Sequence, residues 1–366
     1  MSGAGERSEG EPMGRAGLML RWAVVLGVPA ALTGAFVWCG GWLSAPVDAP
    51  RIVDAFEATA ARYPGFRRNH AKGICVTGHF DSNGAGRAVS RASAFAPGRY
   101  PLVGRLSMPG TDPTREDATG MVRSFALRMT MPGGEQWRLA MNSAPIFAVR
   151  TPQALFEQLR ADARDPRTGR ADPEKMQAFL DAHPEAGAFD RYLAAHPSSS
   201  GYDNARYYGI SAFRVDDARG ARRFVRWEVV PDDAYRPVDA REQRDPDFLA
   251  YDLTQRLARG PLRWHLVLNV ALPGDPLDDS TRAWAPSPSR PRIDAGTVVI
   301  DRAQTQIDGP CRDVVFDPTV LPAGIAPSAD PLLAARSATY GESFRRRMTE
   351  EAAAIRASRH RGGGAG

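Results

Sequence analysis

An arginine and a tyrosine four residues apart stand out near the C-terminal end of the sequence. The stretch AARSATYGESF, residues 334–344, contains Arg336 and Tyr340. Positions i and i+4 of a helix lie on one face and are close enough to touch. Two interpretations are open. The pair can be a chance one on a surface helix, or the guanidinium can keep the phenol deprotonated so that it binds a metal ion.

Other polar residues could take part in acid–base or anion-binding chemistry. His70 stands directly before a predicted strand, and Asn142 ends another. A lone histidine is more often structural or exposed than catalytic, and an asparagine at a strand end is commonly a turn or cap residue. Taken singly, Arg67, Arg105 and Arg336 would be solvated charges.

Several common kinds of site lack their sequence motifs. The cysteines outside the N-terminal apolar stretch, Cys75 and Cys311, stand too far apart for a zinc motif. There is no glycine-rich phosphate loop and no Gly-x-Ser-x-Gly elbow. The 366 residues carry a formal net charge of +5, but the charges are scattered, and no basic stripe accompanies the excess. We therefore expect no nucleic-acid partner.

The two distant cysteines leave their redox state open. Cys75 and Cys311 could form a disulfide in an oxidising compartment. Nothing in the sequence brings them together, so we expect two separate buried thiols.

An uncharged apolar stretch near the N-terminus, residues 22–43, has the length of a bilayer-spanning helix. Arg15 and Arg21 precede it, which favours a cytoplasmic N-terminus. A cleaved signal peptide is the alternative, but prolines follow the candidate cleavage alanines. We expect a disordered segment 1–21, a retained anchor, and a catalytic domain held in the periplasm at the cytoplasmic membrane.

The rest of the chain predicts one domain, residues 50–350, followed by a flexible tail, 351–366. Short stretches with period-two alternation predict strands. These stretches are 73–81, 102–109, 122–131, 135–143, 207–216, 223–231, 262–272 and 296–303. Helical spacing appears between the two groups of four and again after residue 330. The pattern suggests a closed eight-stranded antiparallel barrel with inserted and C-terminal helices.

Four segments in order resemble motifs of the haem catalases, especially the small catalase-related peroxidases with an N-terminal membrane segment. They are RRNHAKGICVTGHF, GRLSMPG, NSAPIFAVR and DPTVLPAGIAPSADPLLAARSATY. The resemblance covers about residues 60 to 347. It implies an α+β catalase-like fold: an eight-stranded antiparallel β-barrel with inserted and C-terminal helices, here preceded by one transmembrane helix. It also implies haem b as the cofactor.

The resemblance assigns a role to each candidate residue. Tyr340 would be the axial ligand of haem iron, as tyrosine is in catalases, and Arg336 would favour its phenolate. His70 would be the acid–base group that moves the peroxide proton, and Asn142 would hydrogen-bond the peroxide. Ser107 would orient the imidazole of His70. The arginines expected at the haem propionates are Arg67, Arg105 and Arg336.

The sequence also departs from the larger catalases. It has neither their long N-terminal arm nor their additional C-terminal chain, so we expect a monomer or dimer and no NADPH binding. The residue before the distal histidine, usually valine, is Asn69. The aspartate of the catalase channel is replaced by Met121. Loss of that charge, and of the arms that lengthen the channel, should widen access and weaken selectivity for hydrogen peroxide.

The resemblance therefore predicts a haem peroxidase with little catalase activity. It would reduce organic hydroperoxides, and hydrogen peroxide weakly, while oxidising small electron donors. One alternative is a catalase-like isomerase or lyase that rearranges fatty-acid hydroperoxides. Another is a barrel that binds haem without catalysis, although such a protein would need neither His70 nor Asn142.

Overall fold

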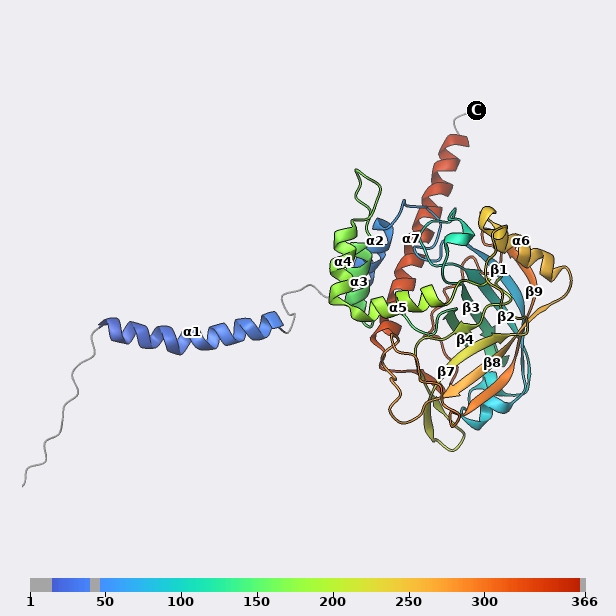
Figure 1. Ribbon diagram of the computed structural model, residues 1–366, viewed down its shortest axis with the longest axis horizontal. Coiled ribbons are helices and arrows are strands. Elements are labelled where there is room, and N and C mark those ends of the chain that lie inside the picture. The colour runs from blue at the N-terminus through green and yellow to red at the C-terminus, as the bar shows by residue number, and fades with distance from the viewer. Residues whose placement is uncertain (1–14, 40–46, 363–366) are drawn as a thin grey trace, which may run out of the picture. The chain divides into compact units, whose positions relative to one another are not determined.

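The computed structural model describes residues 15–39 and 47–362, and the chain divides into two units, Met1–Pro46 and Val47–Gly366. In the first unit the structure describes one helix, α1 (Arg15–Cys39). The second unit contains the β-barrel and the other helices (Figure 1).

The expectation of a transmembrane anchor is wrong. Residues 22–39 of the expected anchor belong to α1, and residues 40–43 lie outside the described residues. Among the helices of the described ranges, none is long and apolar enough to cross a membrane. The membrane partner and the periplasmic location inferred from this anchor are withdrawn with it.

The second unit is built around a closed antiparallel barrel, as the sequence pattern predicts. Its strands are β1 (Gly73–Ser82), β2 (Gly98–Ser107), β3 (Ser124–Thr130), β4 (Gln136–Asn142), β5 (Tyr207–Tyr208), β7 (Arg222–Pro231), β8 (Leu262–Val270) and β9 (Arg292–Thr305). Each pairs with the next in this order, and β9 pairs with β1 to close the ring of eight. Outside the ring, β6 (Phe213–Asp216) pairs with β7, and β10 (Ile325–Pro327) pairs with β6.

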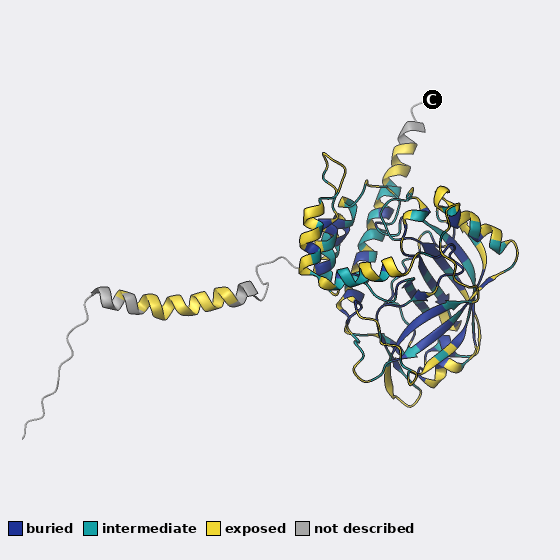
Figure 2. Ribbon diagram, viewed as in Figure 1, coloured by how far each residue is buried: buried dark blue, intermediate teal, exposed yellow. Residues whose placement is uncertain are grey.

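The barrel interior is filled by side chains. On β4, Trp137, Leu139 and Met141 are buried, and the residues between them are only partly buried. Period-two alternation of this kind marks a strand whose one face packs in a core. Phe125 of β3 and Trp264 of β8 pack against each other in the same core, and the strands appear largely buried (Figure 2). A sizeable ligand must therefore bind at the rim or on the outer face.

Most helices of the second unit gather on one side of the barrel (Figure 1). They are α2 (Ala49–Ala58), α3 (Pro152–Ala161), α4 (Pro173–Ala182), α5 (Pro184–Ala195) and α7 (Pro331–Gly362), while α6 (Phe248–Leu257) lies apart from them. Helix starts follow ordinary capping chemistry. Thr151, for example, accepts a hydrogen bond from the N–H of Ala154, and Pro152 opens α3.

The expected strand 207–216 is interrupted. It forms β5 and β6, and the segment between them bends away from the ladder. A Cβ at Gly209 would come within 2.5 Å of the indole of Trp227, so the backbone packs directly on that ring. The bend turns Ile210 towards the cavity described below.

Two of the predicted segments differ from the structure. The sequence predicts disorder over residues 1–21; residues 15–21 begin α1, and residues 1–14 lie outside the described residues. Residues 351–362 continue α7, although a flexible tail was expected from 351.

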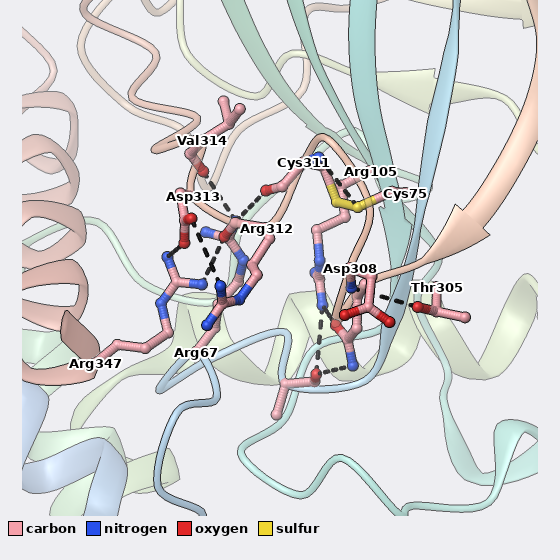
Figure 3. Close-up of a disulfide and its surroundings, with 12 residues drawn as sticks. Arg67, Cys75, Arg105, Thr305, Asp308, Cys311, Arg312, Asp313, Val314 and Arg347 are labelled. Carbon is pink, nitrogen blue, oxygen red and sulfur yellow. Dashed lines mark hydrogen bonds and ion pairs between the residues drawn. A yellow bond between two sulfur atoms is a disulfide. The ribbon is translucent and has the colours of Figure 1, made fainter. Parts of the chain in front are cut away.

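Cys75 and Cys311 form a disulfide, so the prediction of two separate thiols is wrong. Their Cα atoms are 5.2 Å apart, although 236 residues separate them in the chain. The bond joins β1 to the loop between β9 and β10, and both residues are fully buried (Figure 3).

Candidate active site

One cavity collects every site residue that the sequence predicts. It is lined by Arg67, His70, Arg105, Ser107, Asn142, Arg336 and Tyr340, and also by Asn69. About 1220 Å³ within it is free of protein atoms, a volume that includes space open to solvent. The walls come from the outer face of β2–β4, the segment before β1, and α7.

The register of β2, β3 and β4 places polar groups in one row on the outer face of the barrel. Ser107 is paired with Ser124, and Ser124 with Asn142. In the row two residues along the strands, Arg105 is paired with Ala126, and Ala126 with Ala140. Because alternate residues of a strand share a face, all six point to the same side. The two alanines leave a flat wall between the polar groups.

His70 lies over this row in an unusual backbone conformation. Its φ is 57°, the one positive φ among non-glycine residues of the described chain. Such a left-handed residue costs about 1–2 kcal/mol, so neighbouring contacts must hold it. The hydroxyl of Ser107 lies 3.4 Å from Nδ1 of the imidazole. The expected orienting role of Ser107 is consistent with this distance.

The imidazole of His70 is kept neutral by its surroundings. Burial lowers its pKa to about 3, and the positive charges of Arg105, Arg336 and Arg67 act in the same direction. A neutral imidazole at neutral pH can accept a proton.

The amide of Asn142 is oriented by its cross-strand neighbour. The hydroxyl of Ser124 donates to Oδ1 of Asn142 at 2.7 Å. Since the oxygen is the acceptor, Nδ2 is the end left for a ligand, and it is a donor only.

Arg336 and Tyr340 do lie side by side on α7. Nη2 of Arg336 donates to the phenol oxygen of Tyr340 at 3.3 Å, and both residues line the cavity. The first interpretation, a chance pair on a surface helix, does not fit this placement.

Arg67 and Arg105 line the cavity together with a third arginine, Arg347; Arg105 and Arg347 are buried, and Arg67 is half-buried (Figure 3). Burial lowers the pKa of Arg67 well below its usual value, and Arg105 and Arg347 add to the effect. Burial likewise lowers the pKa of Arg105 to about 10, with Arg347 acting in the same direction. Cations that destabilise one another in this way favour an anionic ligand.

Arg347 is a site residue that the sequence analysis missed. It is 4% exposed, and its Nη2 makes no hydrogen bond within the described residues, although Asp313 lies 3.9 Å away. The seven-residue spacing from Tyr340, two helical turns, would have placed it on the same helix face.

The main chain of the loop at 311–314 holds two of these arginines in place. Nη2 of Arg67 donates to the carbonyl oxygens of Cys311 at 3.0 Å and Val314 at 2.9 Å. Nη1 of Arg347 donates to the carbonyl of Arg312 (Figure 3). The disulfide ties this loop to β1, next to the paired strand that carries Arg105.

The cavity fits haem by the chemistry of its lining. Arg67, Arg105 and Arg347 offer bidentate donors for two carboxylates, and one of their buried nitrogens has no hydrogen-bond partner in the described residues. The phenol of Tyr340 offers an oxygen ligand. Apolar side chains, together with Ala126 and Ala140, line a flat apolar slot between the arginines and Tyr340.

The two residues that depart from catalases lie in different places. Asn69 lines the cavity, but its carbonyl oxygen is engaged with the main chain and does not face a ligand. Met121 is 60% exposed and lines a second pocket, to which Ser143, the neighbour of Asn142, also contributes.

The chain is similar in sequence to known proteins of one family. The sequence profile of the catalase family, described as "Catalase", matches residues 59–361. The "Catalase-related peroxidase" of Synechococcus elongatus is 34% identical over 84% of this chain and 91% of its own length. A protein of the same description from Mycolicibacterium paratuberculosis is 31% identical over 83% and 96%.

Solved structures show the same fold. A fungal catalase superposes with a TM-score of 0.70 at 20% identity, covering 78% of this chain and 59% of its own. Catalase A from Saccharomyces cerevisiae gives 0.70 at 20% identity, covering 78% and 62%. The chain thus spans about three-fifths of the length of these catalases. The family profile and the two similar peroxidases support a haem peroxidase in the oxidoreductase class. The chain therefore belongs to the catalase family.

Proposed function

We propose that residues 50–350 form a domain that binds haem b and reduces organic hydroperoxides, and hydrogen peroxide weakly, while oxidising small electron donors. The observation that carries this proposal is a single cavity with two chemically distinct walls. Tyr340 and Arg336 stand on α7, while His70 and Asn142 belong to the barrel side. A phenol oxygen from one wall, with an acid–base group and a hydrogen-bond donor from the other, could support peroxide cleavage at a metal centre.

On the α7 side, Tyr340 would ligate the iron, and Arg336 would donate a hydrogen bond to its oxygen. Arg67, Arg105 and Arg347 would pair with the two propionates. When bound, haem supplies the iron that takes up the oxidising equivalents of the peroxide.

On the barrel side, the chain would move one proton. Nε2 of His70 would take the proton from the inner peroxide oxygen and return it to the outer oxygen as that oxygen leaves. Nδ2 of Asn142 would donate a hydrogen bond to the peroxide without titrating. The Ser124 hydroxyl would keep that amide in the donating orientation.

The preference for organic peroxides rests on the absence of charge at Met121. Its side chain is neutral and exposed, and it lines a second pocket together with Ser143, the residue that follows Asn142. A thioether there would tolerate an apolar peroxide substituent, where a carboxylate would favour a small polar one.

The proposed function is tested by the ratio of donor molecules oxidised to hydroperoxide molecules consumed. The full chain, loaded with haem, is mixed with cumene hydroperoxide and a phenolic donor. We expect two donor molecules to be oxidised per hydroperoxide consumed, and a higher kcat/KM for cumene hydroperoxide than for hydrogen peroxide. Consumption of hydroperoxide without donor oxidation would identify an isomerase or lyase instead. A haem protein that consumes no hydroperoxide would be a binding barrel.

Replacing Arg347 should weaken haem retention. Arg347→Met removes a buried cation from the predicted propionate partners, and charge-assisted hydrogen bonds contribute about 1.5–3 kcal/mol each. We expect haem to be lost to an excess of a haem-scavenging apoprotein ~10-fold faster or more. Arg345→Met is the matched control, because Arg345 is exposed on the same helix. Equal loss rates for the two variants would contradict the assignment.

Replacing Ser124 should weaken the interaction with peroxide without affecting haem. Ser124→Ala frees Oδ1 of Asn142 and allows the amide to turn. A single hydrogen bond of about 0.5–1.5 kcal/mol corresponds to a fall of roughly 3- to 10-fold in kcat/KM for hydroperoxide. An unchanged kcat/KM at unchanged haem content would show that Ser124 does not orient the amide.

A further inference from the structure

The backbone at His70 is held by the side chain directly before it. Oδ1 of Asn69 accepts a hydrogen bond from the N–H of His70 at 2.9 Å and a second from the N–H of Gly110 at 2.8 Å. Both partners are main-chain donors, so only the oxygen of the amide can face them. The orientation of the Asn69 amide is therefore fixed by its neighbours.

These bonds join two segments that frame the imidazole. The N–H of Ala71 donates to the carbonyl of Gly110 at 2.9 Å, so the segment 69–71 is tied to Gly110 by both main chain and side chain. Gly110 lies three residues beyond Ser107, whose hydroxyl approaches Nδ1 of His70. The Asn69 amide thus fixes His70 relative to the residue expected to orient its ring.

The backbone conformation of His70 explains why the hydrogen bonds to Asn69 matter. With φ at 57°, His70 is in the left-handed region, which a residue with a side chain leaves readily unless its surroundings hold it. A relaxed backbone at this position would swing the imidazole away from the cavity. A displacement of about 1 Å at a reacting group can cost roughly 10²-fold in rate.

We propose that Asn69 is a positioning residue for the proton transfer: its carboxamide clamps the main chain of His70 to Gly110 and so keeps the imidazole over the reacting peroxide. This proposal rests on the proposed function for the role of His70, but the clamp itself is a property of the protein main chain.

Hydrogen exchange tests the clamp without reference to activity. In the unmodified full chain, the amides of His70 and Gly110 should be protected. In Asn69→Leu, which is close in size but has no acceptor, they should exchange about 3- to 10-fold faster, the scale of one hydrogen bond. Asn69→Asp keeps an acceptor oxygen and should preserve the protection. Unprotected exchange at both amides of the unmodified chain would overturn the proposal, even if Asn69→Leu fails to accumulate.

Kinetics test whether the clamp acts through the imidazole. Asn69→Leu should lower the second-order rate of hydroperoxide consumption ~10- to 100-fold at unchanged haem content, and Asn69→Asp should stay within about 3-fold of the unmodified enzyme. In a His70→Ala background, Asn69→Leu should have no further effect, because the two changes remove the same step. An equal additional loss in that background would overturn the positioning role.

A control variant and the unmodified enzyme distinguish failure of the positioning role from failure of the proposed function. Asn83→Leu removes a side-chain acceptor for the N–H of Ala85 in an exposed turn and should leave the rate unchanged. An unmodified enzyme that consumes no hydroperoxide would refute the proposed function. The exchange results would then still decide whether Asn69 holds the His70 backbone.

Discussion

Tyr340→Phe is expected to abolish stable haem incorporation. The substitution removes one oxygen and keeps the ring, so the packing of α7 is nearly unchanged. Iron would lose its only anionic ligand from the chain, and Arg336 would lose its hydrogen-bond acceptor in the cavity. We expect haem content after purification to fall by about tenfold or more, since a lost metal ligand exceeds the ~1.4 kcal/mol that a factor of ten represents.

The absorption spectrum and the iron content measure this loss. Tyr251→Phe is the control, because Tyr251 is exposed on α6 far from the lining residues in the sequence. An unchanged Soret band with unchanged haem content in Tyr340→Phe would remove Tyr340 as the ligand and leave Arg336 unexplained.

His70→Ala is expected to slow the reaction with hydroperoxide by ~10²-fold or more, the usual scale for a positioned acid–base group. Haem content should stay near that of the unmodified enzyme, since His70 is not the predicted ligand. Stopped-flow mixing, followed by the first absorbance change after hydroperoxide addition, measures the rate. His265→Ala is the control, because that histidine is partly exposed on β8.

The pH dependence of the reaction rate is a second test of His70 as the group that accepts the peroxide proton. A histidine must be neutral to accept the peroxide proton. Burial is the largest cause that lowers the pKa of His70 to about 3, and the charges of three nearby arginines act in the same direction. The rate for the unmodified enzyme should therefore stay level as the pH falls from 8 to about 5, instead of declining near the ordinary histidine value of ~6.5. A decline centred near 6.5 would mean that His70 titrates normally or is not the base.

The barrel and the site residues could be predicted because their information is local. Period-two alternation along stretches such as QWRLAMN specifies a strand with one buried face. The four motif segments place His70, Asn142 and Tyr340 in order along the chain. The structure confirms the eight-stranded ring and brings these three residues into one cavity.

The contacts between distant segments could not be predicted. Nothing local shows that Cys75 and Cys311 approach one another, because the loop at 311 is positioned by the closure of β9 on β1. The bridge from Asn69 to Gly110 also depends on how two separate turns meet. Arg347 is different, because its seven-residue spacing from Tyr340 along a helix is visible in the sequence.

The N-terminal error has a simple physical origin. The prediction rests on the absence of charge over residues 22–43, on the length of this stretch and on the arginines that precede it. Among the helices of the described residues, none is long and apolar enough to cross a membrane.

The central claim, that the enzyme is a peroxidase with little catalase activity, is tested most directly with an oxygen electrode. Haem-loaded full-length enzyme is given hydrogen peroxide with and without a phenolic donor, while oxygen and donor oxidation are recorded together. We expect donor oxidation to account for most of the peroxide consumed, with little oxygen evolved. Vigorous oxygen release, at turnover rivalling donor oxidation, would contradict the account and identify a true catalase.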